Sequence, residues 1–239
     1  MFNRLSAFLG KPLPFHGVSV HSPTIDEIAD KGYAHYQIHL ILATFDKEGV
    51  LLHLFGISEQ DYAPLAEQDS FDLLTSHSQI AQHIADSLSF FVKADVSYLP
   101  EENSFACDGT LFLDKTNYQE WITLIQQLNG MTDSSKKTEL QFKNERAKRL
   151  YNEMQRQKRK LSANQQDALE LKDILSILCS VEGNAVSVFN VGSLTIYQVY
   201  EQFERLSLNY KRQTLLPVWA NGYLGEGEKL PELFTKTTL

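Results

Sequence analysis

Two histidines four residues apart are the first side chains in this sequence that could do chemistry. His35 and His39 lie in the segment from Tyr33 to Phe45, which is apolar on most sides and predicts a buried helix. At this spacing both imidazoles share a helical face and could bind a metal ion. A zincin would need a glutamate between them, and a catalytic site would need a third ligand that the sequence does not indicate. We interpret them as histidines at the margin of a packed helix and predict no metal site.

Cys107 is the other candidate for catalysis, because a cysteine can act as a nucleophile with a distant histidine. It lies in a hairpin-like stretch and lacks any local signature of such a nucleophile. The sequence also contains no GxSxG motif. The glycines in residues 222–227 are not followed by the helix that a phosphate-binding loop requires. We therefore predict no catalytic residue, no cofactor and no enzymatic activity.

A basic segment has the clearest potential for interaction. Residues 143–160 hold eight basic and two acidic side chains, a local net charge of +6, whereas the whole chain has a formal net charge of −8. The apolar positions make only a narrow stripe, which predicts a helix that packs on one side and projects charge on the other. The rest of the chain is strongly acidic and would repel nucleic acid. This balance favours pairing with an acidic partner helix or with the chain's own acidic part.

We expect partner contacts from this basic helix and from aromatic residues near the C-terminus. A nucleic-acid-binding module that uses the basic helix 143–160 stays open as an alternative, and a steep salt dependence of affinity would support it. The predicted contact residues are Arg146, Arg149, Tyr151, Met154, Arg156, Lys158, Arg159, Trp219 and Tyr223.

A long amphipathic helix must position the C-terminal aromatic residues. From Asn190 to Tyr210, apolar residues recur at the three- and four-residue intervals of one buried helical face. Gly192 breaks the preceding segment, and Ser193 is well placed to act as N-cap. Before this helix, residues 185–189 (AVSVF) predict a short extended piece. After it, the Gly- and Pro-rich tail contains enough large apolar side chains to pack across a surface.

The remaining patterns predict a mainly α, α+β fold, in which a helical core carries a short N-terminal strand and a small β-hairpin element in the middle. Three capping and turn signals define its elements. We predict a short strand over Pro14 to His21, a helix opened by Thr24 and Glu27 and stopped at Gly32, a hairpin with its turn at Asp108-Gly109, and a helix opened by Thr116 and Gln119 and stopped at Asn129-Gly130.

The bulk properties favour a soluble protein of a reducing compartment. With 239 residues and two cysteines, the chain can bury a sizeable core but cannot form a secreted disulfide framework. The N-terminus has no run long enough for a signal peptide or a membrane span. We expect three parts: an N-terminal α+β domain over 1–130, a linker over 131–137 (MTDSSKK) and a C-terminal helical domain over 138–239.

Two phrases in the sequence resemble proteins of the tail gene module of tailed bacteriophages of Gram-positive hosts. The first is SPTIDEIADKGYAHYQIHLIL, which follows the predicted N-terminal strand, and the second is LTIYQVYEQFERL near the C-terminus. The order of a basic helix, a buried helix and a compact terminal segment is also similar to that group.

The resemblance implies a tail assembly chaperone, a non-enzymatic factor of the host cytoplasm. Such proteins bind the tape measure protein and keep its long apolar helices soluble while tail tube subunits polymerise around it. The resemblance implies no catalytic residues. A structural protein of the virion, in the tail or the connector, stays open as an alternative, and self-association is compatible with either function.

Overall fold

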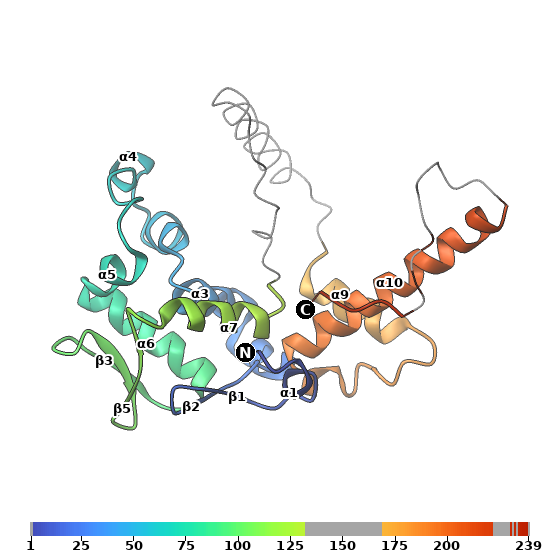
Figure 1. Cartoon of the computed structure of the whole chain (residues 1–239), viewed down its shortest axis with the longest axis horizontal. Helices are drawn as coiled ribbons and strands as arrows, with labels where there is room; N and C mark the ends of the chain where they lie inside the picture. The colour runs from blue at the N-terminus through green and yellow to red at the C-terminus, as the bar shows by residue number, and fades with distance from the viewer. Residues whose placement is uncertain (1, 132–168, 222–229, 231, 233, 239) are drawn as a thin grey trace.

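Figure 1 shows the computed structural model, which describes residues 2–131, 169–221, 230, 232 and 234–238. The chain has the predicted α+β fold, with a helical core and two small antiparallel sheets. A body that contains α3, α5, α6, α7 and the strands lies on one side, and α10 projects away from it with α9 alongside (Figure 1). The basic segment 143–160 and the predicted linker, apart from Met131, lie outside the described residues.

The N-terminal strand is in fact a hairpin. Helix α1 (Arg4–Phe8) is followed by β1 (Leu13–Phe15) and β2 (Val18–Val20), which pair antiparallel. His16 and Gly17 form the turn with φ of 40° and 91°, the positive values that two-residue hairpin turns require. The prediction of a strand over Pro14 to His21 was wrong because His16-Gly17 is not one of the residue pairs, such as Asn-Gly or Asp-Gly, that signal a two-residue hairpin turn.

Helix α2 (Ile25–Lys31) begins with the predicted capping box. The Thr24 hydroxyl accepts a hydrogen bond from the Glu27 backbone N–H at 3.2 Å, and the Glu27 carboxylate accepts one from the Thr24 N–H at 2.8 Å. The predicted stop at Gly32 is confirmed, with φ of 85°. The predicted buried helix follows as α3 (Tyr33–Ala43), which buries Tyr36, Leu40, Leu42 and Ala43 but exposes its first turn.

The middle of the chain follows the sequence pattern closely. Helical elements precede a three-stranded meander whose last two strands are joined at Asp108-Gly109, the predicted hairpin turn, with φ of 48° and 76°. The elements are the π-helical turn η1 (Gly49–Leu54), α4 (Glu59–Tyr62), α5 (Ser70–Thr75), α6 (Ser78–Val92), β3 (Val96–Leu99), β4 (Ser104–Cys107) and β5 (Thr110–Asp114).

Helix α7 (Tyr118–Leu128) ends at Asn129-Gly130, as predicted, but its start differs. The N-cap is Asn117, whose side chain makes no capping hydrogen bond. Thr116 does not form the predicted capping box because its hydroxyl donates instead to the Asp114 carboxylate at 2.6 Å. The same carboxylate accepts the Thr116 backbone N–H at 2.7 Å, so Asp114 closes the turn that leads into α7.

The C-terminal part contains α9 (Leu171–Ser180), η2 (Val191–Ser193) and α10 (Ile196–Ala220). Residues 185–189 form bends and turns, so the prediction of an extended piece was wrong. The N-cap of α10 is Thr195 and not Ser193, and the helix continues well past Tyr210. Pro217 lies within one turn of the helix end, where the Pro217 carbonyl accepts the backbone N–H of Asn221 at 3.1 Å.

One apolar core connects the two ends of the chain. Its aromatic centre includes Trp121, whose indole Nε1–H donates to the Ala43 carbonyl at 2.9 Å. Buried residues of α9 and α10 belong to the same cluster as those of the N-terminal elements. The C-terminal members of this cluster are Ile174, Leu178, Ile196, Tyr197 and Val199.

Candidate partner-binding surface

Of the two predicted histidines, His39 packs against α6, whereas His35 is exposed. The His39 ring stacks on Phe90, with centroids 5.0 Å apart and planes at 11°, and its Nδ1 lies 3.1 Å from the Ser87 hydroxyl. Burial, and then the neighbouring Lys31 and His35, lower the pKa of His39. Among the described residues, no group of three His, Cys, Asp or Glu side chains could hold a metal ion.

Cys107 is buried in β4, opposite Val96 of β3. Burial, followed by the charges of Asp108 and Asp95, raises the pKa of its thiol. A thiol with a raised pKa is mostly protonated at neutral pH, and the thiolate is the reactive form. This environment therefore disfavours Cys107 as a nucleophile.

The start of α10 is fixed in the body by paired backbone hydrogen bonds. Thr24 and Thr195 form an isolated antiparallel bridge. On either side of it, the Ile25 N–H donates to the Leu194 carbonyl at 2.9 Å, and the Ile196 N–H donates to the Pro23 carbonyl at 2.8 Å. Helices α2 and α10 consequently begin side by side, each with its own capping box.

The Ser22 hydroxyl and two glycines, Gly130 and Gly192, also contribute to the region where the start of α10 packs on the body, which we call the seat. The Ser22 hydroxyl donates to the Leu128 carbonyl at 2.8 Å and accepts the Tyr197 N–H at 3.2 Å. A Cβ at Gly130 would lie 2.3 Å from the Tyr200 ring, and one at Gly192 would lie 2.0 Å from the Asp26 carboxylate. Both glycines therefore permit approaches that a larger residue would block.

Beyond the seat, α10 becomes increasingly exposed. Its 25 residues give a length of about 37 Å. Two lines of residues run along it at alternating four- and three-residue spacing. The core line contains Ile196, Val199, Phe203 and Leu206, which all belong to or pack against the core cluster. The outer line, on the opposite side, is formed by positions 201, 205, 208, 212, 215 and 219.

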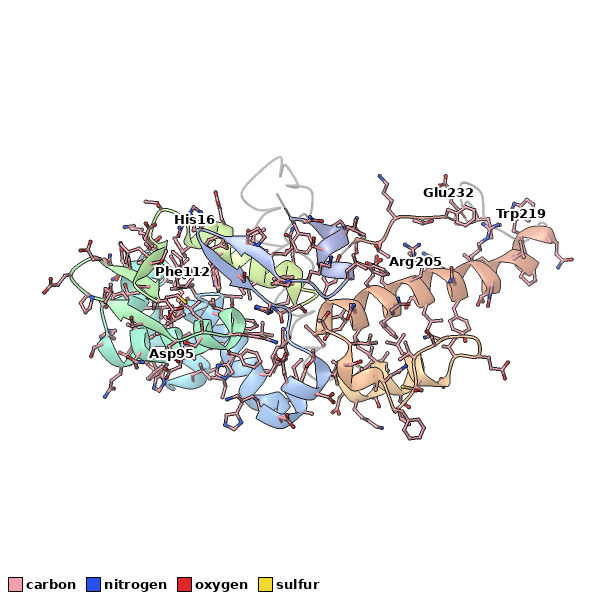
Figure 2. All side chains as sticks on the ribbon, turned by 90° about the horizontal axis from the view of Figure 1, so that it is seen from below. His16, Asp95, Phe112, Arg205, Trp219 and Glu232 are labelled. Carbon is pink, nitrogen blue, oxygen red and sulfur yellow. The ribbon has the colours of Figure 1, made fainter. Side chains whose placement is uncertain are left out.

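The C-terminal tail packs across the start of this outer line, as predicted. Thr237 is buried, accepts two hydrogen bonds from Arg4 at 2.7 and 3.1 Å, and donates to Glu201 at 2.8 Å. Arg205 donates to the Thr235 carbonyl at 2.5 Å. Figure 2 shows Arg205 between α10 and the tail, with Glu232 on the tail and Trp219 near the far end of the helix.

Large apolar side chains are exposed across this C-terminal arm, which we define as residues 169–221 with the described tail residues 230, 232 and 234–238. A turn presents two of them: Asn190 accepts the Ser187 N–H at 2.7 Å and donates to the Ala185 carbonyl at 2.7 Å. The exposed fractions are 53% for Leu169, 73% for Val188, 96% for Phe189, 54% for Tyr210, 43% for Leu216, 55% for Trp219 and 89% for Phe234. Exposed apolar patches can mark interaction sites.

Of the predicted contact residues, the structure describes only Trp219, which lies on this exposed surface. The others lie outside the described residues: Arg146, Arg149, Tyr151, Met154, Arg156, Lys158, Arg159 and Tyr223. Val188-Phe189 was not among the predicted contacts, although two adjacent apolar residues between Ser187 and Asn190 interrupt the helical period and could have indicated a presented turn.

No helix in the described parts of the chain combines the length and apolar character needed to cross a bilayer. Comparison with curated proteins gave no match, and comparison with solved structures gave none either. A family model, the YomV second domain, matches residues 162–238. That range contains α9, α10 and the tail, so the match falls on the C-terminal arm and leaves the N-terminal body unassigned. The C-terminal arm is therefore similar to the second domain of YomV, which is a phage-derived family.

Proposed function

We propose that this chain is a non-enzymatic phage tail morphogenesis factor that binds the tape measure protein and keeps it soluble in the host cytoplasm. Two features support a phage function: the resemblance of two sequence phrases to tail-module proteins, and the similarity of the C-terminal arm to a phage-derived family. The observation that carries the proposal is the concentration of exposed apolar side chains on that arm.

The physical requirement of such a factor is a surface that covers apolar helices reversibly. A long helix with an apolar stripe aggregates in water, and a second helix that buries the stripe prevents this. The C-terminal arm offers a helix, α10, that is anchored at one end and exposed at the other. It also offers Phe189 on a turn whose backbone is held by hydrogen bonds, so the turn loses less backbone entropy on binding than an unconstrained loop would.

Co-expression with the cognate tape measure protein tests the proposal. We expect the tape measure protein to remain in the soluble fraction and to co-purify with this chain. The double variant Val188→Ser, Phe189→Ser should reduce the co-purified amount, whereas Leu111→Ser, which replaces an exposed leucine of the body, should not. Absence of a complex, with both proteins soluble and folded, would contradict the proposal.

The alternative, a structural virion protein, predicts the same complex but a different fate. A chaperone leaves the assembled tail, whereas a structural protein remains in it. Mass spectrometry of purified particles separates the two. We expect mature tails to contain far less of this chain than of any structural component.

A further inference from the structure

An acidic lobe projects from the body between α3 and α5. We define it as residues 46–68, which contain η1 and α4 (Figure 1). The Lys47 ammonium donates to the Ala66 carbonyl and, at 2.6 Å, to the Gln68 carbonyl, so the two flanks of the lobe are joined. Because η1 and α4 also pack against each other, the lobe presents one continuous surface.

The charges of the acidic lobe are almost all negative. The lobe contains five carboxylates and one lysine, a local net charge of 1 − 5 = −4, and no lysine or arginine occurs between Lys47 and Lys93. The carboxylates of Glu48, Glu59 and Glu67 are exposed, and none of them forms an ion pair with another described residue. This surface therefore attracts a cationic partner.

Aromatic side chains lie on the same lobe. Phe55 follows η1 directly and is 45% exposed. Tyr62 of α4 lies near Glu48 and Asp46, whose charges add to the effect of burial and raise the pKa of its hydroxyl. The lobe thus combines exposed aromatic surface with unpaired carboxylates, which favours a helix whose basic side chains flank an apolar stripe.

We propose that the acidic lobe binds the basic segment of the same chain, residues 143–160. That segment has a local net charge of +6 and a narrow apolar stripe, the complement of the lobe in both respects. Its lysines and arginines pair with Glu48, Glu59 and Glu67, and its stripe packs on Phe55. The inference is independent of the proposed function, because no other protein takes part in the contact.

The N-terminal connection is long enough for this contact. The Trp121 indole donates to the Ala43 carbonyl at 2.9 Å, and η1 packs on the helix that ends at Ala43. Met131 lies ten residues after Trp121, a rise of about 15 Å along α7. Residues 132–142 can extend to about 36–40 Å, which covers the distance from Met131 to the lobe.

The C-terminal connection is long enough as well. Leu169 lines one groove with Ile25, Ile28 and Tyr33. Tyr33 begins α3, which is about 16 Å long, and the lobe follows the other end of this helix. Residues 161–168 can extend to about 26–29 Å. Because the segment is tethered at both ends, its own lobe meets it at an effective concentration that a second copy does not reach in dilute solution.

Zero-length carbodiimide cross-linking of the full chain tests the inference, because it joins only an amine and a carboxylate that touch. We expect the monomeric fraction to contain cross-links from the segment to Glu48, Glu59 or Glu67, identified by mass spectrometry. A mixture of unlabelled and isotope-labelled chains shows whether a cross-link joins two copies. The lysines of the segment are Lys143, Lys148, Lys158 and Lys160.

Trypsin cleavage after the basic residues 143–160 gives a second measurement. The triple variant Glu48→Gln, Glu59→Gln, Glu67→Gln should be cleaved there roughly fivefold faster or more, because the segment loses its ionic partners. The matched control is an equal loss of charge on exposed positions around β3, which should leave the cleavage rate unchanged. This control is Asp95→Asn, Glu101→Gln, Glu102→Gln.

Three results would overturn the inference. They are cross-links that reach Asp95, Glu101 and Glu102 as often as the lobe, cross-links that mainly join two copies, and equal cleavage rates in the two triple variants. Circular dichroism verifies that both variants are folded. Co-purification of the tape measure protein is a separate measurement, so a failure of the proposed function leaves these results unaffected, and the reverse also holds.

Discussion

Gly130 shows how single residues determine where α10 can dock. The glycine has φ of 67°, and the Tyr200 ring occupies the space where a Cβ would lie, 2.3 Å away. A side chain at this position would be strained by the backbone and would also collide with the aromatic ring.

Gly130→Ala is expected to destabilise the protein by about 2–4 kcal/mol, the sum of backbone strain and overpacking. Gly56→Ala is the matched control, because Gly56 has the same φ of 67° but no heavy atom within 4 Å of the place where a Cβ would lie. Urea unfolding of both variants measures the difference between them. Equal decreases in the free energy of unfolding for the two variants would show that the Tyr200 ring moves aside without destabilising the protein.

Tyr36 supplies a buried polar contact whose contribution to stability depends on pH. Its hydroxyl donates to the Asn129 Oδ1 at 3.0 Å, and Asn129 in turn donates to the Ile125 carbonyl at 2.7 Å. Burial, together with the nearby Tyr200 and Tyr33, raises the pKa of Tyr36 well above its usual value. The folded protein therefore holds the phenolic proton more tightly than the unfolded chain does.

Tyr36→Phe is expected to reduce the free energy of unfolding by about 1–3 kcal/mol at neutral pH, because the Asn129 oxygen loses its donor. Above about pH 10 the unfolded chain loses the tyrosine proton while the folded protein retains it, so the wild type loses stability there. The gap between wild type and variant should then narrow. Denaturant unfolding from pH 7 to 11 measures this, and a gap that widens would contradict it.

At the scale of elements, the N-cap of α10 differs between the sequence-based prediction and the structure. Ser193 and Thr195 are both capable N-caps. The structure uses Thr195, whose hydroxyl accepts the Gln198 N–H at 3.3 Å while the Gln198 side chain accepts the Thr195 N–H at 2.9 Å. The choice follows from the bridge between Thr24 and Thr195, a long-range contact that local sequence cannot reveal.

Thr195→Ala is expected to destabilise the protein by about 1 kcal/mol, whereas Ser193→Ala should remain within about 0.5 kcal/mol. Ser193 is exposed, and its hydroxyl only donates to the Asn190 carbonyl at 2.8 Å. Thermal unfolding of the two variants checks the order. A larger loss for Ser193→Ala would mean that the helix begins two residues earlier.

The elements whose signals are local were predictable. The capping box at Thr24 and Glu27, the Asp108-Gly109 turn and the stop at Gly130 each depend on residues within a few positions of one another. The hairpin turn at His16 and the cap at Asn117 were not predictable in this way. In both, the residue types are permissive, and contacts from elsewhere decide the conformation.

The candidate surface was predictable only in part, for a related reason. The prediction ended this helix at Tyr210, whereas α10 continues to Ala220. Pro217 does not stop it, because a proline close to the C-terminus of a helix removes only one hydrogen bond. The exposed residues Tyr210, Leu216 and Trp219 are recognised as parts of one helix only when that helix is known to extend to Ala220. Trp219 was nevertheless identified from its type and position.

At the scale of the whole molecule, the two ends of the chain share one core. The first turn of α10 contributes Ile196, Tyr197 and Val199, each at most 1% exposed. Burying a side chain of this size stabilises a protein by about 1.5–3 kcal/mol, and a whole domain has only about 5–15 kcal/mol of net stability. The body should therefore depend on the arm, despite the expected division at residues 131–137.

A fragment of residues 1–131 is expected to unfold at a clearly lower urea concentration than the full chain. The full chain with Trp219→Phe is the matched control, because Trp121 is then the sole tryptophan in both proteins. Trp121 emission follows unfolding in each. Identical midpoints would show that residues 1–130 form an independent domain.

The Ser22 hydroxyl joins three segments that are far apart in the chain, since its partners are Leu128 and Tyr197. During synthesis, residues 22–25 and 128–130 leave the ribosome long before residue 197, because the chain emerges from its N-terminus. The residues of the body that form the seat are therefore synthesised before the helix α10 that packs on them. Folding can be completed only during the last third of translation. Until then, the N-terminal part of the nascent chain exposes the apolar surface that α10 later covers.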